Sequence, residues 1–421
     1  MGKNKKLISI FLIVIAFLSI STGTFLLINN KDKASGKENN TVDPDKPEPN
    51  KVVYDGFTFA FLKLETNKNN MVYSPLSVKY ALSMLSEGAN GETKTELDNL
   101  LKDLTLTKYD NIDKVLSLAN SMFIRDSYKD KVKSEYIDTL TSKYNAEVKY
   151  DSFENASNVN KWIEEKTFKI IKNMLQDELV QNPELEMLLI NALAIDMGWE
   201  LEFQNEDTRS QEFTKIDNQK INVAMMSMTT NSKSVKYHKD DVYTAVSLPL
   251  KKYSGTQLEF IAVMPNEANL DNTLTSDNLN QTMNSLMDKL KEVESGRLNI
   301  QIPRFDFEYK TNLNNDLMAL GVKKAFTDEA DFSKIANTGL SVGEVLHKAN
   351  VKITEKGVKA AAATVITMKD NAVEIQEPEE ITVLKFDKPF LFVIRDMNTG
   401  EVWFVGSVYE PQLWDTVKDN Y

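Results

Sequence analysis

The chain has 421 residues, 42% hydrophobic and 27% charged, which is typical of a globular protein able to bury a sizeable core. Its formal net charge is -12 and no Lys/Arg-rich run follows the first few residues, so we expect no nucleic-acid partner. It has no cysteine and only two histidines, which excludes disulfides, a cysteine nucleophile and a His-rich metal site. We expect no metal and no cofactor.

The N-terminus carries a targeting pattern. Lys3, Lys5 and Lys6 precede an uncharged stretch, residues 7–28, that is long enough to cross a bilayer as a helix. Positive charge before such a helix favours retention of the N-terminus in the cytoplasm. The pattern predicts a cytoplasmic segment at residues 1–6, a signal-anchor transmembrane helix at 7–28, and a folded part on the extracellular side of the cell membrane.

The same stretch has a second interpretation, a cleaved signal peptide on a secreted protein. Residues 7–18 would be its apolar region, and Ser19, Ser21 or Gly23 would supply small residues for processing. We favour the anchor because the stretch has no A-x-A-like site and its apolar character resumes at residues 25–28.

A polar interval separates this stretch from the rest of the chain. Residues 29–52 are rich in Lys, Asp, Glu, Asn and Pro and offer almost nothing to bury, which is typical of a disordered linker. Apolar periodicity then continues without another such interval. We therefore expect one domain at residues 53–411 and a C-terminal tail at 412–421.

Helical and strand patterns are mixed within this domain. Helical spacing of apolar residues predicts helices at 78–84, 92–101 and 155–169. Apolar or alternating runs predict strands at 187–195, 243–250, 258–264, 298–307, 390–394 and 402–408, and the last two flank a turn-rich connection typical of a hairpin. Helices first and strands later predict an α+β fold with mostly antiparallel sheet.

Residues 352–368 combine conflicting preferences. Gly357 interrupts the segment, four alanines occupy 360–363, and the β-formers TVIT follow at 364–367. Read with period two, one face carries Val358 and the even-numbered residues after it, which is the pattern of a strand, whereas alanine favours helix or coil. Such a segment can exist in two states. The alternative is a surface helix beside a loop.

Five sequence blocks resemble the serpin family, in family order. They are NMVYSPLSVKYALSML at 70–85, LINALAIDMGWELEF at 189–203, VLHKA at 345–349, EKGVKAAAAT at 355–364, and LKFDKPFLFVI at 384–394. The resemblance implies the serpin fold, with three β-sheets, eight to nine α-helices and an exposed reactive-centre loop. It also implies a monomeric, irreversible suicide-substrate inhibitor of a serine, or alternatively cysteine, protease. The protease cleaves the loop and is trapped as a covalent acyl-enzyme while the freed strand inserts into a sheet.

The resemblance also assigns roles to three groups of residues. The hinge comprises Glu355, Gly357, Val358, Ala360, Ala361, Ala362, Ala363 and Thr364. The breach is an ion pair of Glu355 with Arg304, near Trp199, where the strand first enters the sheet. The shutter is a polar cluster of Ser74, Ser77, Asn191 and His347 beneath the sheet's centre, whose implied role is a hydrogen-bond switch.

The chain departs from the family pattern in two places. Lys169 stands where relatives usually have glycine, and the interval 357–386 is several residues longer than usual, with an acidic insert. The extra length leaves the position of the cleaved bond open.

Counting from the hinge gives a first position for that bond. It places the reactive-site bond between Asn371 and Ala372, with Met368 or Lys369 as alternatives. Lys369 would suit a trypsin-like protease and Met368 a chymotrypsin-like or subtilisin-like one.

Two other functions compete with inhibition. A hydrolase would need His238 or His347 as its base, but the sequence has no G-x-S-x-G nucleophile elbow, so we expect no enzyme. A non-inhibitory serpin-fold surface binding protein is the second, and Lys359 is the only charged residue of the hinge that would favour it.

Overall fold

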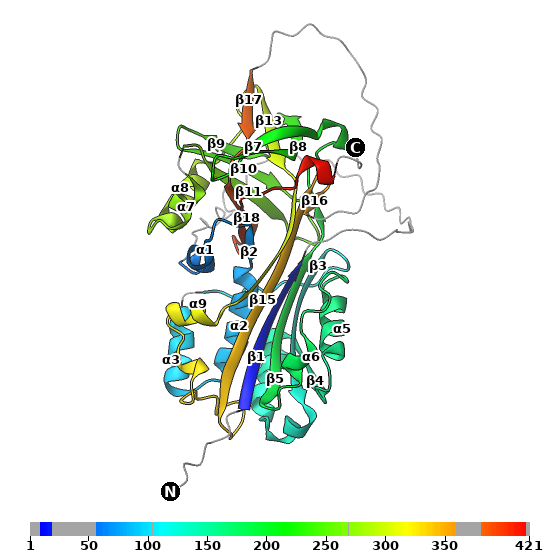
Figure 1. Cartoon of the computed structure of the whole chain (residues 1–421), viewed down its shortest axis with the longest axis vertical. Coiled ribbons are helices and arrows are strands. Elements are labelled where there is room, and N and C mark those ends of the chain that lie inside the picture. The colour runs from blue at the N-terminus through cyan, green and yellow to red at the C-terminus, as the bar shows by residue number, and fades with distance from the viewer. Residues whose placement is uncertain (1–8, 19–55, 103, 268, 359–379, 418–421) are drawn as a thin grey trace, which may run out of the picture.

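The described part of the chain contains nine α-helices. The computed structural model describes residues 9–18, 56–102, 104–267, 269–358 and 380–417 (Figure 1). In this part of the chain the α-helices are α1 (Ala60–Glu65), α2 (Pro75–Gly88), α3 (Gly91–Leu100), α4 (Ser134–Tyr144), α5 (Ser157–Lys166), α6 (Asp177–Val180), α7 (Leu270–Leu274), α8 (Leu279–Lys289) and α9 (Asn314–Ala319).

Helix α2 is the central one. It begins at Pro75 after an N-cap, Ser74, whose side chain accepts a hydrogen bond from the backbone N–H of Ser77 at 3.2 Å. Proline suits the first helical position because its missing N–H would have no partner in the helix. Most residues of α2 are buried, and the helix contacts strands of both large sheets, so it ties them together.

The central sheet contains the segments that the sequence singled out. Its strands, in spatial order, are β4 (Ala146–Asp151), β3 (Leu116–Arg125), β5 (Leu185–Ile195), β1 (Ser9–Leu18), β15 (Leu340–Thr354), β16 (Gly357–Val358) and β6 (Met197–Gly198), and β14 (Phe305–Asn312) also pairs with β15. Strand β1, blue in Figure 1, lies between β5 and β15 and runs parallel to both.

Two further sheets complete the described fold. One has the order β12 (Lys291–Glu292), β9 (Lys236–Lys239), β10 (Tyr243–Pro249), β11 (Leu258–Pro265), β18 (Phe390–Asp396), β19 (Val402–Val408) and β2 (Met71–Tyr73). The other has the order β17 (Ile381–Lys385), β13 (Arg297–Pro303), β8 (Lys220–Thr230) and β7 (Arg209–Thr214). Most strand pairs are antiparallel, as expected from the sequence.

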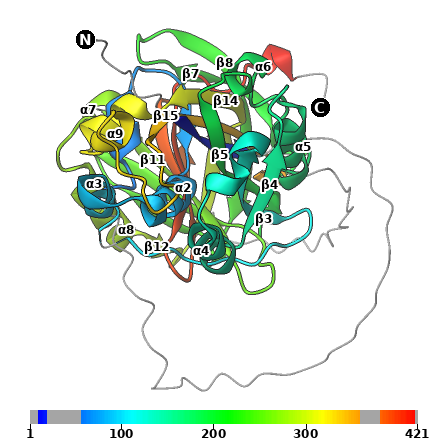
Figure 2. The same ribbon diagram turned by 90° about the horizontal axis from the view of Figure 1, so that it is seen from below.

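Apolar residues pack on both faces of the central sheet. A large cluster shared with α2 covers one face, and a smaller cluster with α5 covers the other. Figure 2 shows the sheet between these helices from below. Where both clusters cover the sheet, a central strand therefore needs apolar side chains on both of its faces, because neither face meets water there.

The helices and the hairpin that the sequence predicted are present in the structure. The helices expected at 78–84, 92–101 and 155–169 correspond to α2, α3 and α5. The expected hairpin is the antiparallel pair β18 and β19. The α+β class with three sheets is confirmed.

One expected strand is two. Residues 298–307 form β13 and β14, which belong to different sheets, with Arg304 between them. Pro303 has no N–H to continue a ladder, and the backbone of Arg304 pairs with Ala224 and Gln412 instead. Gln412 belongs to the expected C-terminal tail, so the start of that tail packs against the four-stranded sheet that contains β8 and β13.

The expectation of a transmembrane anchor at residues 7–28 is wrong. Residues 9–18 form strand β1, not part of a helix. No helix in the described ranges is long and apolar enough to span a bilayer. An apolar run does not by itself distinguish helix from buried strand. Here two flanking strands offer backbone partners, and the β-branched Ile10, Ile13, Val14 and Ile15 suit a strand. The location at the membrane is withdrawn with the anchor.

Candidate functional site

The candidate site is the position between β5 and β15, which we call the slot. Its lower part is formed by residues 185–194 of β5 and 340–348 of β15, and β1 fills it. Its upper part is formed by the end of β15 and by β6, and β16 fills it. Two segments from distant parts of the chain therefore occupy one line in the sheet.

The register of β1 matches the two faces of the sheet. Ile13 lies opposite Leu189 and Val345, and all three belong to the large cluster on the α2 side. The next residue, Val14, lies opposite Ile190 and Leu346, and these three belong to the smaller cluster on the α5 side. Both Ile13 and Val14 are fully buried. The lower part of the slot is thus closed by apolar packing.

At the upper part of the slot, β16 runs antiparallel to β15. Val358 pairs with Ile353 and Gly357 with Thr354. Gly357 has φ +144, and a Cβ added there would lie 2.4 Å from the carbonyl oxygen of Met197. Only glycine fits this conformation and this close approach. The described start of residues 352–368 is therefore strand, whereas the alanines on which the strand and surface-helix interpretations differ lie outside the described residues.

The breach residues are together. Glu355 is buried, and its Oε2 lies 3.5 Å from Nη1 of Arg304. Its Oε1 accepts a hydrogen bond from the Thr208 hydroxyl at 2.7 Å. The indole N–H of buried Trp199 donates to the carbonyl oxygen of Thr354 at 2.8 Å. Both the carboxylate and the end of β15 that precedes it are thus fixed at the top of the slot.

A second group of charges lies beside the turn that joins β15 to β16. Lys356 and Lys251 lie 3.1 and 2.7 Å from the two carboxylate oxygens of Glu202. Burial acts to raise the pKa of Glu202, but hydrogen bonds from Lys251 and Lys356 outweigh it and hold that pKa below its ordinary value. These charges are more exposed than the Glu355 carboxylate, so their contribution to stability is screened by solvent.

Three of the four expected shutter residues are connected. Ser74 caps α2 at the N–H of Ser77, and the Ser77 hydroxyl donates to Oδ1 of Asn191. The Asn191 amide donates onward to Oδ1 of Asn120 at 2.8 Å. This chain of hydrogen bonds joins α2 to β5 and β3 beneath the sheet.

His347 is not directly beside the other shutter residues in the sheet. In the strand register, Ile15 of β1 lies opposite Asn191 on one side and His347 on the other. Burial lowers the pKa of His347 to about 3, although its interaction with the Val72 backbone acts to raise that pKa. The imidazole is therefore neutral at physiological pH. The expected cluster is divided by one inserted strand.

Some expected residues cannot be placed. The hinge residues Ala360, Ala361, Ala362, Ala363 and Thr364 and the reactive-site candidates Met368, Lys369, Asn371 and Ala372 lie outside the described residues. Other contributors were missed from the sequence, namely Thr208, Asn120 and Glu202. Each makes its contact through the fold, and no local sequence pattern distinguishes it from other polar residues.

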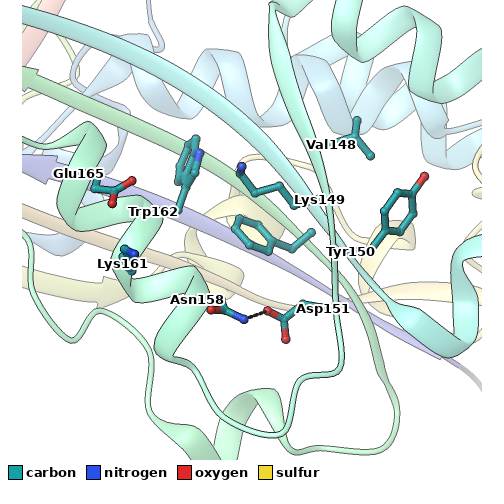
Figure 3. Close-up of a pocket in the computed structure, with 9 residues that line it drawn as sticks. Val148, Lys149, Tyr150, Asp151, Asn158, Lys161, Trp162 and Glu165 are labelled. Atoms are coloured by element: carbon teal, nitrogen blue, oxygen red, sulfur yellow. Dashed lines mark hydrogen bonds between the residues drawn. The ribbon is translucent and has the colours of Figure 1, made fainter.

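Figure 3 shows a pocket of about 490 Å³ at the outer edge of the central sheet. It is bounded by β4 and α5, and Asn158 donates to Asp151 across it at 2.8 Å. Trp162 and Lys149 line its wall. Because β4 is the edge strand, this pocket lies two strands away from the slot. Within the described ranges, no group of three or more Asp, Glu or His could hold a metal ion.

The chain matches the family model described as "Serpin (serine protease inhibitor)" over residues 54–411. The chain belongs to the serpin family. An uncharacterized serpin-like protein of Thermococcus kodakarensis is 30% identical over 390 residues, which cover 87% of each chain. The chain is thus a member of a family of protease inhibitors, and the serpin fold expected from the sequence is confirmed.

Solved serpin structures have the same fold. The native state of tengpin, a thermophilic serpin, superposes with a TM-score of 0.70 at 26% identity and covers 84% of this chain and 92% of its own. Human thyroxine-binding globulin superposes with a TM-score of 0.69 at 23% identity and covers 85% of this chain and 97% of its own. The serpin fold thus also occurs in a protein that binds a small ligand.

Proposed function

We propose that this serpin is an irreversible inhibitor of a serine protease, or alternatively a cysteine protease, that acts as a monomer by inserting its cleaved loop into the slot. The observation that carries the proposal is β16. Gly357 and Val358 already lie in the slot at its upper end, antiparallel to β15. This is the direction that a strand continuing from the hinge would take.

The residues of β15 suit such a continuation. Extending the pairing of Val358 with Ile353 would bring Ala360 opposite Val351 and Ala362 opposite Ala349, both of which are buried. The small alanine side chains fit this buried face. About ten new ladder hydrogen bonds would contribute about 10 kcal/mol before the entropy of ordering the loop is subtracted.

The covalent step follows the chemistry of the protease. Its serine Oγ attacks the carbonyl carbon of the scissile residue, for which we propose Asn371 with Met368 or Lys369 as alternatives. The new ester bond replaces the peptide bond, and the freed amine of the next residue leaves with a proton. Insertion of the hinge strand then carries the ester-linked protease away from the hydrolytic geometry. The same insertion would use Arg304, Glu355 and Trp199 as its upper anchor and the shutter residues as its gate.

Incubation with trypsin-like, chymotrypsin-like and subtilisin-like proteases tests the proposal. The chain is used as it is and with Val14→Asp, because β1 shares the slot and a carboxylate in place of a fully buried valine disfavours its seating. We expect at least one of the two chains to form a covalent complex with a protease that survives boiling in detergent. Cleavage between residues 368 and 374 without such a complex, in both chains and with every protease, would contradict inhibition.

A matched pair of hinge variants tests the insertion step. Ala362→Lys places a charge on the face expected to be buried opposite Ala349, and Ala361→Lys places the same charge opposite Asn350, beside Lys348 and Lys352. We expect Ala362→Lys to reduce complex formation at least about tenfold while cleavage continues, because burying an unpaired charge costs several kcal/mol. Ala361→Lys should change it much less. Equal effects of the two variants would contradict insertion in this register.

The second candidate is a non-inhibitory serpin-fold binding protein, and the seated β1 favours it because the slot is already filled. Thermal unfolding of the Val14→Asp chain, in which β1 no longer fills the slot, before and after loop cleavage separates the two functions. An inserting loop raises the melting temperature, and a loop that stays outside leaves it unchanged.

A further inference from the structure

We propose that residues 9–18 are an internal competitor for the slot, so that the chain is blocked as an inhibitor while β1 is seated and competent after β1 leaves. This inference rests on the proposed inhibitory function. It assigns an autoinhibitory role to an N-terminal segment that lies outside residues 54–411, the part matched by the family model.

Strand β1 and the inserted loop strand would need the same backbone partners on β15. Extending the register of β16 along β15 would place residue 363 opposite Lys348 and residue 371 opposite Leu340. Strand β1 already pairs with these positions, from Ser9 opposite Leu340 to Ala16 opposite Lys348. Each backbone group of β15 on the slot side can serve one neighbouring strand, so the two occupants exclude each other.

The overlap also limits how far the hinge strand can extend along β15 while β1 is in place. On the slot side of β15, residues 349–352 lie between the positions paired with β1 and those paired with β16. A strand growing from Val358 could therefore extend to about residue 362 before it met β1. Partial insertion is compatible with β1, whereas full insertion is not.

The composition of the two segments favours β1. Its sequence, SIFLIVIAFL, has no charged residue, whereas residues 363–371 include Lys369 and Asp370. Both sheet faces are apolar around the lower slot, so an uncharged strand loses less on burial. Strand β1 also needs no peptide-bond cleavage to reach the slot. A chain in this state has already gained the stabilisation that loop insertion would otherwise release.

Departure of β1 leaves a sheet that can close. Strands β5 and β15 are both parallel to β1 and hence to each other. They can therefore pair directly as neighbouring parallel strands once they move together by one strand spacing, about 4.8 Å. The closed sheet would bring Asn191 and His347 onto adjacent strands, which reunites the divided shutter. The seated and departed states of β1 are thus two arrangements of one sheet.

An engineered disulfide tests the seat of β1 in the full chain. The protein has no cysteine of its own, so the pair Val14→Cys with Ile190→Cys gives a single bridge between opposite residues on one face. The matched control is Ile13→Cys with Ile190→Cys, whose side chains point to opposite faces of the sheet. We expect complete bridging in the first pair and none in the control. Absence of the bridge in the first pair, or equal bridging in both, would overturn the proposal.

The disulfide-bridged chain then tests whether seated β1 prevents inhibition of the protease. We expect the oxidised Val14→Cys/Ile190→Cys chain to be cleaved by the protease without a covalent complex, and the Val14→Asp chain to form at least about tenfold more complex, because only the competent fraction reacts. Complex formation by the oxidised chain equal to that of Val14→Asp would refute the block while leaving the inhibitory function intact.

A peptide probe keeps the two proposals separate. A dye-labelled peptide with the sequence of residues 358–371 should be taken up by the Val14→Asp chain and excluded by the oxidised chain. If no variant forms a covalent complex with any protease, the inhibitory function fails, and peptide uptake still decides whether β1 competes for the slot. Equal uptake by both chains would overturn the competition.

Discussion

The two ends of the slot are closed by different forces. At the upper end, a two-residue strand is held by a buried ion pair, an indole hydrogen bond and a glycine that no other residue can replace. At the lower end, a ten-residue strand from the far end of the sequence is held by its ladders and by apolar packing on both faces. The upper closure depends on specific pairs and the lower one on buried area. Single substitutions should therefore open the upper end selectively, whereas the lower end should respond to charge.

The largest effect is expected at Glu355. Replacing Glu355 by Ala removes the partner of buried Arg304 and the acceptor for Thr208, and leaves an uncompensated buried charge. We expect a loss of about 3 kcal/mol in the free energy of unfolding, measured by urea titration. The matched control is Glu202→Ala, which removes a carboxylate at the same end but from more exposed pairs, and should cost less than about 1 kcal/mol. A Glu355→Ala chain no less stable than the control would show that polar pairing does not close the upper end.

Gly357→Ala should have the next largest effect. The added methyl group would meet the Met197 carbonyl oxygen, and the positive φ is strained for any L side chain. We expect a loss of about 2 kcal/mol, with faster amide exchange confined to β16, β6 and the end of β15. Gly255→Ala is the control, since its φ is +90 but nothing lies within 4 Å of the added atom. Its cost measures backbone strain alone. If amide exchange became equally fast in β1, the two ends of the slot would not be closed independently.

Acidification should act on the lower end with a smaller effect. Burial depresses the pKa of His347 to about 3, so the folded state binds its proton less readily than the unfolded state does. The stability contributed by the neutral imidazole is present above pH 6.5 and is lost as pH falls from there towards 3. We expect amide protection in β1 and β15 to fall between pH 7 and 6 by about 0.7 kcal/mol, and His347→Gln to remove this dependence. Protection that is independent of pH in the unmodified chain would contradict a neutral, buried His347.

Much of the upper end was predictable from the sequence. The block EKGVK followed by alanines, together with Arg304 and Trp199, marks it through the family resemblance, and the structure brings these described residues together. The contributions of Thr208 and Glu202 were not predictable, because each reaches the site across a long sequence separation from a locally unremarkable segment.

The sequence by itself determined the serpin family, the α+β class, the core helix α2 and the hairpin of β18 and β19, because these follow from local periodicity and from contiguous blocks. Only the tertiary structure decided that residues 9–18 form a strand. An uncharged apolar run satisfies equally well a membrane helix, a signal peptide or a strand buried on both faces. The choice depends on whether backbone partners are available, and here β5 and β15 supply them from sequence positions more than 150 residues away.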